Sequence, residues 1–142
     1  MKTKKLIDTA FVYAIAAMVW GVFYREFTKF FAFSGKTTLA VTHVHFFALG
    51  TLVFLLLALF NLHLNLWEQP QFRWFYRLYN IALPYMVILF TVRGVLQVLG
   101  TPLSTAANAA ISGISGIGHI LMAVSIVLLF LALRRSTASL NK

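Results

Sequence analysis

Residues 39–62 read LAVTHVHFFALGTLVFLLLALFNL, an apolar run that is long enough to cross a membrane as a helix. An α-helix rises 1.5 Å per residue, so roughly 20 apolar residues cover the ~30 Å hydrocarbon core. Two ionisable residues, His43 and His45, lie near the start of this run. Ionisable residues inside such a segment are rare and usually functional. The stretch therefore predicts a transmembrane helix and a candidate site on the same element.

Three further apolar runs flank this one, at residues 6–24, 78–99 and 111–133. Each run has roughly the 19–24 residues of a transmembrane helix. The composition agrees, with 61% hydrophobic residues, 11% charged residues and a mean hydropathy of +0.86. A soluble domain is typically about a quarter charged. We expect an all-α fold, a bundle of four transmembrane helices forming a single membrane domain over residues 1–142.

The net charge of +9 is carried mainly by connections and tails, where it suits anionic lipid head groups better than nucleic acid. Lys and Arg are concentrated at the ends and in the middle connection, which predicts that the N- and C-termini are both cytoplasmic. The expected location is the bacterial inner (cell) membrane, crossed several times, with the lipid bilayer as the first partner. The chain has no cysteine, so metal ligation would fall to His, carboxylate or Met side chains.

Polar residues of the four runs are predicted to share the outer half of the membrane. Counted at 1.5 Å per residue, His43 and His45 lie roughly 6–9 Å below the outer boundary, Arg93 roughly 9 Å and His119 roughly 12 Å. Arg25 and Glu26 end the first run on the same side. Polar groups scattered at random would divide between the two leaflets, so this convergence indicates one site.

Helical spacing of 100° per residue predicts which faces meet. His119 shares a polar, small-residue stripe with Asn108, Ser112 and Ser115, which should face inward. His43 shares a face with Gly50 and Asn61, while His45 points roughly the other way. We expect His43 to oppose His119, and His45 to support that site, to bind at a second site or to lie at a subunit contact.

This arrangement suits a b-type haem, which needs one axial histidine from each of two helices at matched depth. His43 and His119 are the expected ligands, with His45 as a further candidate. Small residues, Gly50, Ser115 and Gly116, would accommodate the macrocycle. Arg25 and Arg93 would bind its propionates, since guanidinium meets carboxylate bidentately. Glu26 is alternatively an ion-pair partner of Arg93, and copper or another transition metal is the alternative cofactor.

Three segments carry a resemblance to a known family: residues 21–27 (GVFYREF), the His-x-His-x-x-x-x-Gly of His43 to Gly50, and Gly118-His119. Together they resemble a small bacterial family of four-span membrane proteins, a domain of unknown function. Residues 43–50 are also similar to a segment of NnrS-type haem- and copper-containing membrane proteins, and more distantly to the second helix of haem–copper oxidases. That second resemblance implies a haem-ligating role for His43, although Phe47 stands where those oxidases usually have methionine.

Other functions remain open from the sequence. An outer-leaflet cluster of His, Arg and Glu also suits a small transporter or channel-like protein that binds an ion, and a non-catalytic accessory subunit needs no ligand. Interhelical hydrogen bonding is the structural alternative for the three histidines. No hydrolase constellation is present, and enzymatic activity stays undecided. Four short helices barely enclose a cofactor, so we expect a homo-oligomer; the sequence names no redox partner.

Overall fold

The computed structural model describes residues 2–140, which form helices joined by short connections, without a strand in that range. The prediction of an all-α protein with four transmembrane-length helices is confirmed by four segments that are long and apolar enough to cross a membrane. The elements are α1 (Lys2–Phe30), α2 (Leu39–His45), the π-helix η1 (Phe46–Leu52), α3 (Val53–Leu64), the 3-10 helix η2 (Leu66–Glu68), α4 (Pro70–Val98) and α5 (Thr105–Leu140).

The helices extend past the apolar runs that predicted them. Helix α4 starts at Pro70 rather than at residue 78, where the third apolar run begins, because proline suits the first turn of a helix, where its missing N–H needs no partner. The last element extends to Leu140, beyond the predicted end at residue 133. Hydropathy predicts only the part of a helix that suits hydrocarbon, whereas the backbone can stay helical beyond that part.

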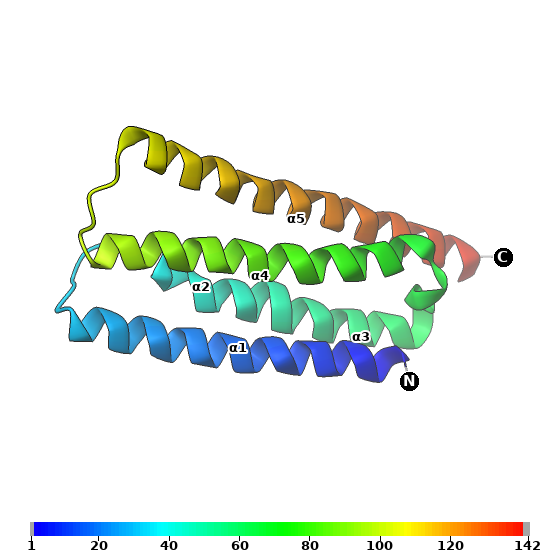
Figure 1. Cartoon of the computed structure of the whole chain (residues 1–142). Helices are drawn as coiled ribbons and strands as arrows, with labels where there is room; N and C mark the ends of the chain where they lie inside the picture. Colours follow the sequence, from blue (N-terminus) through cyan, green and yellow to red (C-terminus); the bar gives the residue numbers. More distant parts are fainter. Residues whose placement is uncertain (1, 141–142) are drawn as a thin grey trace.

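The elements run up and down, and both termini lie at the same end of the bundle (Figure 1). The combined span of α2, η1 and α3 lies between α1 and α4, while α5 packs on the far side of α4. Fully buried aromatic side chains fill the centre, among them Phe54, Phe72, Phe75 and Tyr79. The bundle is thus three packed spans with a fourth on one side.

Side-chain hydrogen bonds tie α1 to α4 across the apolar core. Tyr13 Oη donates to Asn80 Oδ1 at 2.9 Å, and Trp20 Nε1 donates to Thr91 Oγ1 at 2.9 Å. Polar groups in hydrocarbon have no water to bond, so these pairs satisfy each other and fix the contact of the two helices.

The second span contains a π-helical segment directly after His45. Over Phe46–Leu52 the backbone closes wider turns than an α-helix does, an arrangement often found at functional sites. Tyr79 Oη donates to the Leu49 carbonyl at 2.8 Å and supports this segment from α4. Gly50 lets the backbone approach α1, since an added Cβ would lie 2.4 Å from Tyr13 Cγ. The segment sets how α2 is rotated relative to α3.

At the end that holds the termini, an ion pair ties the start of α1 to η2, and a cation–π contact ties it to α4. Lys2 Nζ donates to Glu68 Oε1, and Lys5 Nζ lies 4.7 Å from the Tyr76 ring centroid. The hydrogen bond from Lys2 is the main reason why the pKa of the Glu68 carboxyl lies below its usual value.

Replacing Glu68 by glutamine is expected to cause a small, pH-dependent loss of thermal stability. A carboxyl with a depressed folded-state pKa stabilises above its unfolded pKa, and this contribution disappears as the pH falls through the folded value. Wild type and Glu68→Gln should therefore differ at neutral pH and converge once the pH falls below the folded-state pKa of the Glu68 carboxyl. Both partners are exposed, so salt should shrink the difference. Circular-dichroism melts in detergent measure it.

Glu26→Gln is the control for this experiment, because Glu26 pairs with its neighbour Arg25 on the same helix and joins no separate elements. A difference between wild type and Glu68→Gln that stays constant with pH would contradict the ionic explanation.

Candidate functional site

The polar residues that the sequence singles out lie in the half of the bundle away from the termini. The chain brings them there from four helices: Arg25 and Glu26 near the end of α1, His43 and His45 in α2, Arg93 near the end of α4, and His119 in the first half of α5.

The His43 side chain packs against α1. Its ring stacks on Tyr24, with centroids 6.1 Å apart and planes at 14°. A Cβ at Gly21 would lie 3.7 Å from His43 Cβ and Cγ. Within residues 2–140, the buried His43 Nδ1 has no hydrogen-bond partner. Helical spacing had led us to expect His43 opposite His119. The structure instead places the His43 ring against α1.

An apolar groove of about 500 Å³ runs beside His43 on the surface of α1 and η1. Arg25 lies along this groove, on the α1 side of the molecule. Its guanidinium pairs with Glu26, Nη1 to Oε1 at 3.4 Å. The groove is lined by Ala17, Met18, Gly21, Val22, Arg25, His43 and Phe47.

The structure brings together His45 and His119, because both imidazoles contact the same phenylalanine of α4. The His45 ring packs edge-on to Phe90 at 5.1 Å between centroids, with planes at 75°. The His119 ring contacts the same Phe90 at 5.8 Å and 56°. The contact joins α2, α4 and α5 at one level of the bundle.

Hydrogen bonds fix the tautomer of both imidazoles. His45 Nδ1–H donates to the Val41 carbonyl at 2.7 Å, and His119 Nδ1–H donates to the Ser115 carbonyl at 3.2 Å. A carbonyl can only accept, so Nδ1 carries a proton in each ring, and in the neutral imidazole Nε2 then holds the lone pair. Histidines that ligate a metal almost always make this second hydrogen bond. His45 and His119 meet that condition, and the Nδ1 of His43 does not.

Arg93 lies one helical turn beyond Phe90 and reaches α5. Its Nη2 donates to Ser112 Oγ at 2.7 Å and lies 3.5 Å from the Asn108 carbonyl oxygen. The ion pair with Glu26 that we considered is not formed, because Glu26 is bound to Arg25 on α1. Arg93 is thus a partly exposed cation on the same helix as the phenylalanine that joins the two histidines.

The three small residues expected to accommodate a macrocycle have different surroundings. The Tyr13 ring occupies the space beside Gly50, so a macrocycle has no room there. Ser115 donates through Oγ to the Ile111 carbonyl at 2.7 Å and stays half-buried. A Cβ added at Gly116 would meet nothing within 4 Å, and the same holds at Gly113. Room therefore exists along the first half of α5, which diverges from α4 in Figure 1.

Across the described residues 2–140, no three His, Asp or Glu side chains come together in a way that could hold a metal ion. A copper or similar centre built from protein ligands alone needs three or more such groups. A haem needs only one or two, because the porphyrin supplies four nitrogens to the iron.

Phe90 is the site residue that sequence reasoning missed. It is one of 14 phenylalanines, and nothing in its type sets it apart. Its position three residues before Arg93 places both on one face of α4, which is the signal that could have found it.

Comparison with known proteins gives one match. A family model with the description "Protein of unknown function (DUF2871)" matches residues 3–136, which is nearly the whole chain. No curated protein and no solved structure matches the chain. The similarity of residues 43–50 to NnrS-type proteins stays a prediction.

Proposed function

The chain belongs to this family of proteins of unknown function, and from the site itself we propose that it is an integral membrane b-type haem protein, with His45 and His119 as the iron ligands. The observation that carries the proposal is the pair of Nδ1–H hydrogen bonds to backbone carbonyls, which leaves a free Nε2 on each of two imidazoles that contact the same ring.

Arg93 is the proposed partner of a propionate. It lies one turn from Phe90, toward the end of α4, and its guanidinium already bonds α5 through Ser112. Arginine binds carboxylates through two parallel hydrogen bonds, which suits a propionate at a membrane surface. Arg25 lies on the opposite side, along the His43 groove, and has no part in this site.

The Phe90 ring would decide whether both imidazoles can reach one iron. It contacts both imidazoles, so ligation of one iron by both would require the ring to turn aside. A Cβ at Gly113 or Gly116 would meet nothing within 4 Å, so α5 offers open space in the same half of the bundle. His119 is exposed in the single chain, and a second copy packed on α5 would shield it, in keeping with the expected homo-oligomer.

A bound haem would supply one-electron chemistry, and a diatomic gas would bind the iron by displacing one of the two imidazoles. The protein would serve electron transfer, haem handling or gas sensing in the bacterial cell membrane. The alternative of an ion transporter built on a His/Arg/Glu cluster has less support, because Glu26 and Arg93 bond to different partners on different sides of the bundle.

The absorption spectrum of protein purified from haem-replete cells tests this proposal. We expect a Soret band that shifts on reduction with dithionite, since two imidazole ligands give a low-spin b-type spectrum. The pyridine haemochrome assay should report haem at a stoichiometric fraction of the chain. A colourless, folded preparation from such cells would end the haem proposal.

A further inference from the structure

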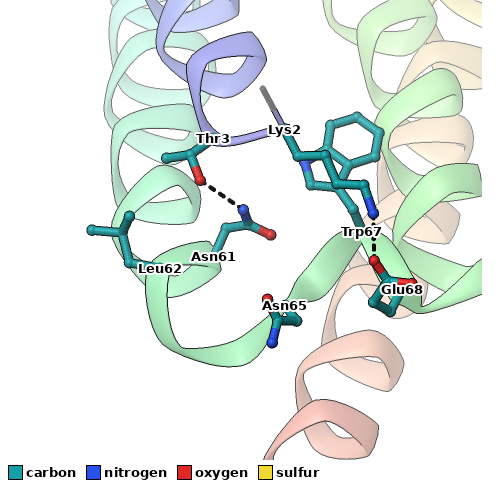
Figure 2. Close-up of a pocket in the computed structure, with 7 residues that line it drawn as sticks. All are labelled: Lys2, Thr3, Asn61, Leu62, Asn65, Trp67 and Glu68. Carbon is teal, nitrogen blue, oxygen red and sulfur yellow. Dashed lines mark hydrogen bonds and ion pairs between the residues drawn. The ribbon is translucent and has the colours of Figure 1, made fainter.

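A second polar site lies at the opposite end of the molecule, where the termini meet the loop that joins α3 to α4. It is a cavity of about 380 Å³ between the first turn of α1 and η2. Figure 2 shows its side chains around a common space. The cavity is lined by Lys2, Thr3, Asn61, Leu62, Asn65, Trp67 and Glu68.

Two buried polar atoms of this cavity lack a partner. Asn61 is only 8% exposed; its Nδ2 donates to Thr3 Oγ1 at 2.9 Å, but its Oδ1 accepts no hydrogen bond from residues 2–140. Figure 2 shows this oxygen pointing toward the shared space. The indole Nε1–H of Trp67 is also buried and unpaired within the described chain. Buried polar groups are rarely left unsatisfied, so one acceptor and one donor await a ligand.

The rim of the cavity carries opposite charges side by side. Lys2 and Glu68 form an ion pair, yet their side chains are 58% and 67% exposed, so each keeps hydrogen-bonding capacity for a second partner. The ligand that complements this rim has a cation and an anion of its own. Leu62, which is 62% exposed, adds an apolar edge that faces outward.

We propose that this cavity binds the phosphoethanolamine head group of a membrane phospholipid. The primary ammonium would donate to Asn61 Oδ1 and Glu68, and the phosphate would accept from Trp67 Nε1–H and Lys2. The acyl chains would lie along the apolar edge at Leu62. Phosphocholine has the same net charge but no N–H to donate, and phosphoglycerol has no cation, so both fit less well.

Native mass spectrometry tests this with the full chain released from nanodiscs that contain phosphatidylethanolamine, phosphatidylcholine and phosphatidylglycerol in equal amounts and with identical acyl chains. Wild type should retain the ethanolamine lipid about tenfold over the choline lipid, the value of one charge-assisted hydrogen bond. Trp67→Phe keeps the ring and removes only the N–H, and Asn61→Leu removes the acceptor at similar volume. Both should lose most of this preference.

Trp74→Phe is the matched control, because Trp74 is 61% exposed at the same end of the molecule and does not line the cavity. It should retain the wild-type preference. Equal retention of ethanolamine and choline lipids by wild type would overturn the proposal, as would a preference for phosphatidylglycerol or a full ethanolamine preference in Trp67→Phe. None of these outcomes depends on haem.

Discussion

Replacing His119 or His45 by alanine is expected to lower haem occupancy at least about tenfold, while replacing His43 leaves it near the wild-type value. Removing a second-sphere partner of a metal ligand already costs 10–100-fold, and removing the ligand itself costs no less. His43 is spared because its Nδ1 has no acceptor within residues 2–140 to fix the ligating tautomer, and because its ring packs on α1. The Soret absorbance per mole of protein, read after identical purification, gives the occupancy.

Each alanine variant serves as a control for the other two, because each removes one imidazole from the same half of the bundle. Equal helicity by circular dichroism establishes that all are folded. Added imidazole should restore part of the Soret band in His119→Ala, whose side chain is exposed and leaves an accessible gap. Loss of haem in His43→Ala with full retention in His45→Ala would contradict the assignment and return the ligand role to His43.

The second large effect is expected at Gly50, where alanine should strongly destabilise the fold. The added Cβ would lie 2.4 Å from Tyr13 Cγ, 2.6 Å from Cβ and 2.8 Å from Cδ1. Tyr13 cannot easily retreat, because its hydroxyl bonds Asn80 and its ring stacks on Phe54 at 5.7 Å. Overpacking of this kind typically costs about 1–3 kcal/mol. Thermal melts in detergent should show a clearly lower midpoint.

Gly116→Ala is the matched substitution, because its added Cβ would meet nothing within 4 Å. It should leave the midpoint unchanged or raise it slightly, since alanine favours a helix over glycine by up to about 1 kcal/mol. An equal loss in both variants would show that the close approach of Tyr13 to Gly50 does not limit stability.

Helical spacing predicted the faces of the second span but not their neighbours. His43, Gly50 and Asn61 do share a face, and each contacts α1: at Gly21, at Tyr13 and at Thr3 respectively. His45 lies on the other face, against α4. A periodicity of 100° relates residues within one helix, whereas the choice of partner helix depends on how four helices assemble. The expectation of His43 against His119 failed at that step.

For α5, helical spacing predicted a contact with the neighbouring helix that the structure does form. The stripe of Asn108, Ser112 and Ser115 was expected to face inward, and the structure joins it to α4 through the Arg93–Ser112 hydrogen bond. Two polar stripes on consecutive antiparallel helices have few other partners in hydrocarbon, so this pairing could be derived from sequence. The contact of Phe90 with both imidazoles could not, because apolar side chains carry no such constraint.

The wide turn that follows His45 has a genetic consequence. A turn closed by i→i+5 bonds holds one residue more than an α-helical turn, so a chain with one codon fewer between Phe46 and Leu52 would form an uninterrupted α-helix. In such a chain the helix ahead of the deletion would keep its present faces, because the wide turn already absorbs the roughly 100° of rotation that its extra residue would add to an α-helix. The imidazole of His43 would stay against α1 and that of His45 against α4, so the loss of a single codon is expected to remove the wide turn without changing which helix each imidazole contacts.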